Sequence, residues 1–163
     1  MSAHVVPEPA WKSLEGWRRD DHRIVFTNGV FDLLHRGHVE YLEDARALGD
    51  RLVIGVNSDA SVRRLKGPNR PIVPEAERAE LLEALRCVDL AIVFEDDSPE
   101  RLIQAVRPDV LAKGGDWAID KILGREFVES YGGKVLNIPL REGLSTSILV
   151  DRILNHRSAL EDC

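Results

Sequence analysis

TNGVFDLLHRGH, residues 27–38, joins a short apolar run at 24–26 to a helical pattern that begins near Val39. A loop that leads from a strand into a helix presents free backbone N–H groups and the positive end of the helix dipole, where an anion can bind. Gly29 and Gly37 have no Cβ, so the backbone can turn sharply there and a flat base or a phosphate can come close. The segment therefore predicts a phosphate site at the carboxyl end of the first strand.

Two histidines in this loop supply directed hydrogen-bond donors. His35 and His38 are close enough along the chain to bind neighbouring oxygens of one triphosphate. The other uses of such a pair are a structural contact or a zinc site, but zinc needs at least a third ligand and no Cys or His with suitable spacing is nearby. The segment is not the dinucleotide fingerprint, and the chain has no Walker loop, since Gly133-Lys134 is followed by Val135. The pattern favours phosphate binding by imidazole.

Five short apolar runs, rich in β-branched residues, recur along the chain and predict buried strands. They are Ile24 to Phe26, Leu52 to Val56, Leu90 to Phe94, Val110 to Ala112 and Val135 to Ile138. Helical patterns alternate with these runs, which predicts right-handed βαβ units. The expected fold is α/β: a single-domain, Rossmann-like, doubly wound sheet of five parallel strands, with ligands at the carboxyl ends of the strands.

Apolar stripes at helical spacing mark the segments that are expected to cover this sheet. Three of them are Val39, Leu42 and Ala45; Ala79, Leu82 and Leu85; and Leu102, Ile103 and Val106. Two later stripes are Phe127, Val128 and Tyr131, and Leu149, Val150, Ile153 and Leu154. We expect all five to be buried, the last of them in a helix that Ser145 and Thr146 open.

The alternation of strands and helices covers residues 23–157 and leaves a segment on either side. Residues 1–22 are expected to be an N-terminal extension, in which Trp11, Leu14 and Trp17 predict a short amphipathic helix docked on the domain or on a sister subunit. Residues 158–163 are expected to be a C-terminal tail.

The composition narrows the class of protein. A chain of 163 residues is long enough for one substantial core but short for two domains. The formal charge of -6 argues against a nonspecific nucleic-acid or anionic-membrane surface, so any phosphate must be bound locally. The sequence shows no disulfide framework, membrane span or signal peptide. We therefore expect a cytoplasmic protein that binds neither nucleic acid nor membrane.

The loop with its two histidines resembles the H-x-G-H signature of the cytidylyltransferase-like nucleotidylyltransferases. Further segments fall in the order expected for one branch of this superfamily: Gly55 to Asp59, Arg64 to Gly67, Arg70-Pro71, Arg78, Lys113 to Asp116 and Ser145 to Ser147. Together they resemble bacterial D-glycero-β-D-manno-heptose 1-phosphate adenylyltransferases over residues 23–154. The kinase domain to which this activity is often fused is absent from the sequence, so the resemblance implies a stand-alone transferase.

The resemblance implies a reaction and a set of site residues. A sugar 1-phosphate would attack the α-phosphorus of a nucleoside triphosphate, with ATP favoured, and release pyrophosphate. Positioning and charge neutralisation suffice for this step, with Mg²⁺ bridging the phosphates and no enzyme nucleophile. His35, His38 and Lys66 would be the catalytic residues, although a solvated surface position is the usual fate of a lysine. The other ligand-binding residues would be Thr27, Asn28, Gly29, Phe31, Gly37, Arg78, Lys113, Gly115, Asp116, Ser145 and Thr146.

Several of these residues have structural alternatives. Arg78 can pair with a neighbour on its own helix, and Ser145 and Thr146 can cap the last helix, a use that is compatible with phosphate binding. Asp32 either accepts backbone N–H bonds in its loop or helps to organise magnesium. Asp116 has three candidate partners, namely the ribose, the base and the sugar phosphate. No residue is assigned as a metal ligand.

Three positions depart from the pattern of the heptose enzymes. Trp117 and Leu144 stand where Tyr is common, and Ser147 stands where Thr is common. They bear on the acceptor and the base, so the alternatives are GTP in place of ATP, a cytidylyltransferase for glycerol 3-phosphate, or an FMN adenylyltransferase. A nucleotide-binding regulator without turnover is a further alternative. The resemblance also implies a homodimer.

Overall fold

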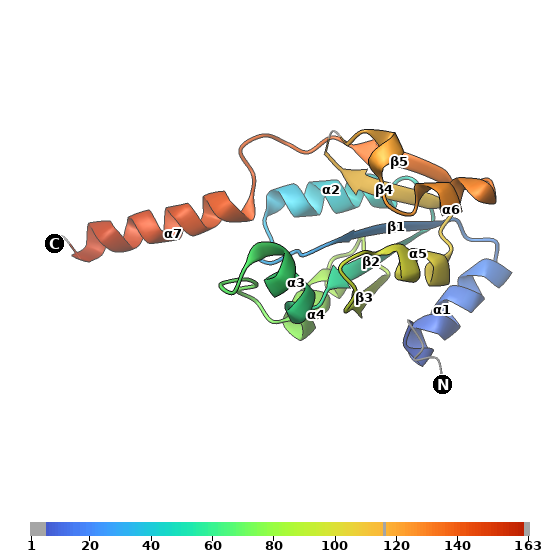
Figure 1. The fold of residues 1–163 in the computed structure, drawn as a ribbon, viewed down its shortest axis with the longest axis horizontal. Coiled ribbons are helices and arrows are strands. Elements are labelled where there is room, and N and C mark those ends of the chain that lie inside the picture. Colours follow the sequence, from blue (N-terminus) through green and yellow to red (C-terminus); the bar gives the residue numbers. More distant parts are fainter. Residues whose placement is uncertain (1–5, 116, 162–163) are drawn as a thin grey trace.

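The structure is a computed structural model that describes residues 6–115 and 117–161, with side chains described as far as residue 156. Five parallel strands form one sheet in the order β3-β2-β1-β4-β5 (Figure 1). They are β1 (Ile24–Gly29), β2 (Arg51–Asn57), β3 (Leu90–Phe94), β4 (Val110–Gly114) and β5 (Lys134–Ile138). Each contains one of the five apolar runs, so the predicted Rossmann-like parallel sheet is confirmed.

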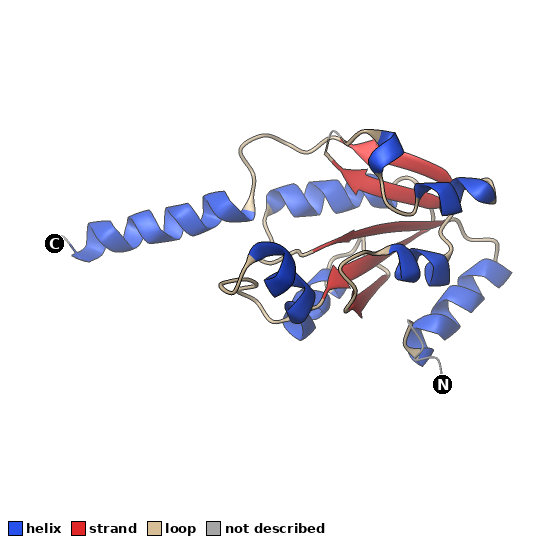
Figure 2. Ribbon diagram, in the orientation of Figure 1, coloured by secondary structure: helices blue, strands red, loops and turns tan. Residues whose placement is uncertain are grey.

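Helices cover both faces of the sheet (Figure 2). They are α1 (Glu8–Arg19), α2 (Arg36–Arg46), α3 (Asp59–Lys66), α4 (Glu75–Glu83), α5 (Glu100–Val106), α6 (Arg125–Ser130) and α7 (Thr146–Glu161), with a 3-10 turn η1 (Ile119–Lys121). Residues of α1, α5 and α6 pack with Ile24 and Phe26 in one core. Residues of α2 and α4 pack with Val25 in the other core. Neighbouring residues of β1 thus enter opposite cores, as the pleat of a strand requires.

The central strand diverges from one of its neighbours at its carboxyl end. β1 pairs with β2 along its whole length, from Ile24 to Gly29. With β4 it pairs only at Val25 and Phe26, while β4 itself stays paired with β5 as far as Gly114. The chain leaves β1 on one side and returns through β4 on the other, which is the switch point where parallel sheets bind ligands. An opening between the ends of β1 and β4 follows.

The helix α1 is an integral part of the layer that contains α5 and α6. Val6, Ala10 and Leu14 belong to the core that also holds α5 and α6, and Leu14 is fully buried. Arg18 donates a hydrogen bond to the backbone oxygen of Val106, at the end of α5. The apolar period of this segment therefore serves to dock it against its own domain.

The last helix, α7, differs from the expectation. It extends away from the sheet and its covering helices (Figure 1), and Ile153 and Leu154 are 62% and 55% exposed. The prediction that these residues form a buried stripe is wrong for this chain by itself, because helical spacing reports an apolar face but not the surface that covers it. The backbone is helical to Glu161, so the segment expected to be a tail from residue 158 continues the helix.

None of the helices in the described part of the chain combines the length and the apolar character that crossing a membrane requires.

Candidate functional site

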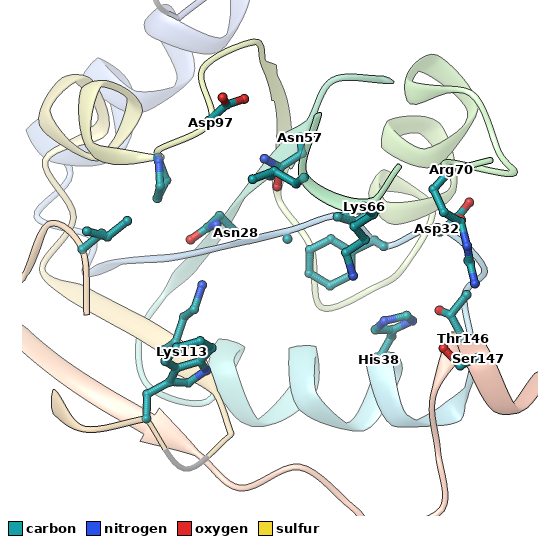
Figure 3. A pocket seen from close by; sticks show the side chains of 17 residues that line it. Asn28, Asp32, His38, Asn57, Lys66, Arg70, Asp97, Lys113, Thr146 and Ser147 are labelled. Atoms are coloured by element: carbon teal, nitrogen blue, oxygen red, sulfur yellow. The ribbon is translucent and has the colours of Figure 1, made fainter. Parts of the chain in front are cut away.

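A cleft of about 780 Å³ opens at the carboxyl end of the sheet, above the end of β1. It is bounded by the loop between β1 and α2, the ends of β2, α3 and β4, and the start of α7 (Figure 3). Its lining residues are Asn28, Gly29, Val30, Phe31, Asp32, His38, Asn57, Leu65, Lys66, Arg70, Asp97, Pro99, Lys113, Trp117, Leu123, Thr146 and Ser147. The cleft lies at the opening between β1 and β4, where the sheet topology favours ligand binding.

The two histidines form a stacked pair at the start of α2. His35 is the N-cap residue, with an extended backbone, and its Nδ1 accepts a 3.4 Å hydrogen bond from the backbone N–H of His38. The two rings lie 3.8 Å apart between centroids and are tilted by 20°. Only His38 lines the cleft, where Phe31 also contacts it. His35 therefore supports the ring that faces the cleft.

Burial disfavours the charged form of both imidazoles. Burial, and then repulsion from His35, lower the pKa of His38 from 6.5 to about 4, and burial lowers the pKa of His35. Nδ1 of His38 is also buried without a hydrogen-bond partner among the described residues. An anion in the cleft would offset the penalty on the charged form, since a nearby opposite charge raises the pKa of an imidazole.

Gly37 between the histidines is needed for close packing. A Cβ at this position would lie 3.0 Å from Cε1 and Nδ1 of His35 and 3.0 Å from Cβ of Leu144. Real Cβ atoms rarely come so close to a neighbour, so a side chain here would displace the His35 ring or the segment before α7. The glycine thus lets that segment close over the start of α2.

Two lysines project into the cleft from different sides (Figure 3). Lys66 is the last residue of α3 and forms no ion pair with any described residue. Lys113 lies in β4, and burial lowers the pKa of its ammonium group. Two unpaired cations in one cleft, within a chain of net charge -6, indicate a local site for an anionic ligand.

Asp32 organises the loop between α3 and α4, which contains Arg70 and which we call the Arg70 loop. Its carboxylate accepts hydrogen bonds from the backbone N–H groups of Ile72 and Val73, at 2.8 and 2.9 Å, and from Arg70 at 2.9 Å. Burial acts to raise its pKa, but the bonds from Val73, Ile72 and Arg70 outweigh burial and lower it. Of the two roles considered for Asp32, the structure shows the backbone contacts.

Arg78 lies below the floor of the cleft, which corrects its expected contact with the triphosphate. The side chain is fully buried. It donates to the backbone oxygens of Val73, Val30 and Asn57 and pairs with Asp59 at 2.7 Å. A guanidinium with these partners holds together the segments that follow β1, β2 and the Arg70 loop, and it has no face toward a ligand.

Other expected site residues take supporting positions. The buried Thr27 hydroxyl shares a hydrogen bond with Tyr41 and so faces the core, not the cleft. Ser145 Oγ caps α7 by accepting from the N–H of Ile148, at 3.2 Å. Gly115 adopts a positive φ of 100° just after β4 and is not part of the cleft lining. Asp116 lies outside the described residues.

The start of α7 reaches the cleft through Thr146. Its hydroxyl donates to the backbone oxygen of Leu33, at 3.4 Å, and the residue lines the cleft near His38 (Figure 3). Arg141, before the helix, pairs with Glu40 of α2 at 2.7 Å. These contacts hold the amino end of α7 against α2 even though the rest of the helix extends away.

The cleft also contains residues that were not expected as ligand contacts. Asn57 and Arg70 belong to segments that carry the family resemblance, so a signal for them was present in the sequence. Asp97 and Leu123 have no such signal, because they come from loops that only the fold brings to the cleft. Asp97 pairs with Arg64 at 2.8 Å.

No group of three or more His, Cys, Asp or Glu side chains able to hold a metal occurs within residues 6–115 and 117–156. Asp32 and Asp97, the carboxylates of the cleft lining, are both engaged by arginine. The residues present fit a magnesium ion whose ligands come mainly from phosphate oxygens and water, as is usual for Mg²⁺ in phosphate chemistry.

Comparison with known proteins identifies relatives across most of the chain. The family model described as Cytidylyltransferase-like matches residues 26–158. A protein of Syntrophotalea carbinolica named "Bifunctional protein HldE" is 56% identical over 142 residues, which are 87% of this chain and 29% of that protein. A protein of Geobacter sulfurreducens with the same name is 55% identical over 132 residues, 81% of this chain and 27% of its own length. The chain thus spans less than a third of these relatives.

Solved structures agree with the fold. A lipopolysaccharide core biosynthesis protein from Thermoplasma volcanium has a TM-score of 0.59 and 32% identity, covering 74% of this chain and 97% of its own. A protein of unknown function from Archaeoglobus fulgidus has a TM-score of 0.54 over 76% of this chain and 93% of its own. At 21% identity, the second likeness concerns the fold alone.

Proposed function

The chain belongs to the cytidylyltransferase-like family, and from that premise we propose that it is an adenylyltransferase that transfers AMP from ATP to D-glycero-β-D-manno-heptose 1-phosphate. One observation carries the proposal: His38, which stacks on His35, and Lys66 line the same cleft at the carboxyl end of β1. This arrangement suits a polyphosphate. The sequence resemblance to heptose 1-phosphate adenylyltransferases supplies the nucleotide and the acceptor.

The reaction is an in-line displacement at the α-phosphorus of ATP. An anionic oxygen of the sugar phosphate forms the new P–O bond, the bond between the α-phosphorus and the bridging oxygen breaks, and pyrophosphate leaves with that electron pair. The acceptor oxygen is already anionic, so the step needs no enzyme nucleophile and no general base. The contribution of the protein is alignment and stabilisation of charge.

The cleft residues divide this work between them. His38, with its ring at the cleft surface, donates a hydrogen bond to an α- or β-phosphate oxygen as negative charge grows on the leaving group, and His35 positions that ring. Lys66, at the end of a helix and without an ion pair to any described residue, closes on the same oxygens. Thr146 and the first N–H groups of α7 add neutral donors, since a helix amino end is a ready anion site.

We infer that Mg²⁺ enters together with the triphosphate. When bound, it neutralises and orients the phosphate oxygens. Asp32 stays with Arg70 and the backbone N–H groups, which keeps the Arg70 loop in place while the nucleotide binds. A cytoplasmic location, expected from the composition, and a homodimer, implied by the resemblance, are further parts of the proposal.

The test is a matrix of nucleotides and acceptors with release of pyrophosphate as the readout. ATP, CTP, GTP and UTP, each with Mg²⁺, are combined with heptose 1-phosphate, glycerol 3-phosphate or FMN, and products are identified by mass spectrometry. We expect rapid release only for ATP with heptose 1-phosphate, together with ADP-heptose. Preference for another nucleotide and acceptor would change the assigned substrates but keep the assigned type of reaction. Binding of nucleotides without release of pyrophosphate in any combination would identify a regulator.

A histidine variant tests the role of the imidazole pair. His38→Ala is expected to lower kcat about 10²–10³-fold, the usual effect of losing one donor to developing charge. His156→Ala, on the exposed part of α7, is the matched control. Circular dichroism and the melting temperature establish that both variants are folded. Unchanged kcat in folded His38→Ala would remove the histidine from the mechanism.

A further inference from the structure

A recess opens from the cleft on the side of β4, and the phosphate-binding residues proposed above, His38, Lys66 and Thr146, are not part of its lining. It has a volume of about 320 Å³, and its lining residues are Asn28, Pro99, Leu111, Lys113, Trp117, Lys121, Ile122 and Leu123. It shares Asn28, Pro99, Lys113, Trp117 and Leu123 with the cleft, so the two spaces are continuous. We call it the Trp117 recess. It occupies the place where β1 and β4 stop pairing, so the opening of the sheet makes room for it.

The wall of the recess is a fixed aromatic surface. Trp117 is 53% exposed, yet its Nε1 donates to the backbone oxygen of Gly114, at 3.1 Å. Its own backbone oxygen accepts from Asn137 of β5, at 2.6 Å. Leu123, another residue of the lining, is also 53% exposed. A large apolar ring that is held by hydrogen bonds and left open to solvent is typical of a ligand contact surface.

A cation lies at the mouth of this apolar surface. Nζ of Lys113 lies 5.9 Å from the centroid of the Trp117 ring and projects into the cleft (Figure 3). Among the described residues it has no carboxylate partner. The recess therefore offers an apolar face for a ring and, beside it, the charge of Lys113 for an anion, with Lys121 as a second lysine in the lining.

The geometry of the displacement places this recess on the acceptor side. An in-line attack requires the incoming oxygen to approach the α-phosphorus opposite the departing pyrophosphate. His38 and Thr146, assigned to the pyrophosphate, lie across the cleft from Lys113 (Figure 3). The nucleoside is attached through an equatorial oxygen of the α-phosphorus, so it leaves the line of attack sideways. The attacking phosphate oxygen therefore approaches the α-phosphorus from the Lys113 side of the cleft.

We propose that the Trp117 recess is the acceptor subsite and that its ligand class is a monosaccharide phosphate, with Lys113 binding the acceptor phosphate and Trp117 stacking on the sugar ring. The proposal rests on the proposed transferase function. It adds the acceptor contacts and makes Trp117 the residue that determines acceptor specificity.

Size and shape separate the candidate acceptors. The recess volume is at the lower end of the range of small-molecule sites, about 300 Å³, which suits a single sugar ring. Glycerol 3-phosphate, by contrast, has no ring to cover the indole. The C–H face of a pyranose covers apolar surface on Trp117 and Leu123 while its hydroxyl groups face the open cleft.

A binding experiment without nucleotide tests the subsite independently of turnover. The chain has three tryptophans, so Trp11→Phe combined with Trp17→Phe leaves Trp117 as the only indole emitter. This double variant is titrated with heptose 1-phosphate, mannose 1-phosphate, glycerol 3-phosphate and inorganic phosphate. We expect a saturable change in fluorescence with the two sugar phosphates. Glycerol 3-phosphate is expected to bind with an affinity at least about tenfold lower. Adding Lys113→Met to the double variant is expected to abolish the response.

Steady-state kinetics provide the second arm. Trp117→Ala is expected to raise the KM for the sugar phosphate roughly tenfold or more, with the KM for ATP nearly unchanged, and Trp117→Phe is expected to recover most of this loss. Trp17→Phe is the control substitution. A raised KM for ATP in Trp117→Ala would assign the recess to the nucleotide and overturn the proposal.

The two arms distinguish the failure of the subsite from the failure of the function. Turnover of a sugar phosphate that leaves Trp117 fluorescence unchanged would overturn the subsite and keep the transferase. Saturable binding of sugar phosphates at Trp117, without pyrophosphate release from any nucleotide, would keep the subsite and overturn the transferase.

Discussion

At the scale of single residues, His38 combines two causes of a low pKa in one ring. It is desolvated, and it lies against a second imidazole, 3.8 Å away between centroids. A protonated His38 would be repelled by a protonated His35 and would lack water. Both penalties on the protonated form fall when a polyanion occupies the cleft. The cleft therefore favours a negatively charged ligand and disfavours protonation of His38 in its absence.

The low pKa of His38 predicts loss of stability in acid. Between the unfolded pKa of 6.5 and the folded pKa of about 4, the unfolded chain binds the proton and the folded chain does not, so the free energy of unfolding falls as the pH falls. The expected contribution is about 2 kcal/mol between pH 7 and pH 5. Urea unfolding of the wild type and of His38→Gln at both pH values measures it.

The comparison between variants separates His38 from the other titrating groups. His38→Gln is expected to lose less stability than the wild type between pH 7 and 5, whereas His156→Gln, at an exposed position, is expected to follow the wild type. Equal losses in the wild type and in His38→Gln would contradict the assignment of a depressed pKa to His38.

Arg78 illustrates a residue whose contribution is to stability. Removing its guanidinium in Arg78→Met leaves Asp59 and the backbone oxygens of Val30, Val73 and Asn57 without their donor. We expect a decrease of about 3–5 kcal/mol in the free energy of unfolding, measured by urea denaturation. Arg63→Met, at an exposed position of α3, is expected to change it by less than about 0.5 kcal/mol. A similar small effect of Arg78→Met would show that water replaces these bonds.

At the scale of elements, the two terminal helices make opposite use of an apolar face. Leu14 of α1 is fully buried in the core with α5 and α6, whereas Ile153 of α7 is 62% exposed. Both segments show helical spacing in the sequence. The two helices differ in how the chain attaches them to the sheet. A short connection joins α1 to β1 and holds it against the core, whereas contacts of Arg141 and Thr146 fix only the beginning of α7.

This difference predicts unequal costs for the same kind of truncation. Leu14→Ala is expected to lower the free energy of unfolding by about 2–5 kcal/mol, the cost of a cavity in a closed core. Ile153→Ala is expected to lower it by less than about 1 kcal/mol. Urea unfolding at several protein concentrations provides both values. A large, concentration-dependent cost for Ile153→Ala would mean that another copy of the chain covers α7.

At the scale of the whole molecule, an acidic chain places two lysines without a described carboxylate partner in one cleft. The formal charge is -6, yet Lys66 and Lys113 face the same opening. Electrostatic attraction of a nucleotide is therefore local and depends on the fold that unites α3 with β4. Ligand binding then stabilises the folded chain as a whole, because the unfolded chain has no such cluster.

MgATP alone is expected to raise the melting temperature. At a concentration of 100 Kd it adds about 2.7 kcal/mol to the free energy of unfolding, which corresponds to roughly 5–10 °C for a chain of this length. Differential scanning calorimetry without acceptor measures the rise. Lys66→Met is expected to reduce it at the same MgATP concentration, and Lys12→Met, on the exposed face of α1, is expected to leave it unchanged. No rise in the wild type would argue against the cleft as a nucleotide site.

The sequence by itself predicted the parts of the molecule that local pattern determines. Runs such as Leu52 to Val56 are predicted as strands because they are short, β-branched and apolar on both faces. The H-x-G-H loop follows the first such run, Ile24 to Phe26. His38 was found as a candidate because its loop follows the first predicted strand, whereas Lys66 was found through the family resemblance.

Only the tertiary structure decided which distant residues meet. The burial of Arg78, the exposure of Ile153, the arrival of Asp97 and Leu123 at the cleft, and the recess beside Trp117 all depend on how separate elements pack. Periodicity and spacing describe the neighbourhood of a residue along the chain. Contacts across the fold follow from the closure of two cores around one sheet, and no short segment contains that information.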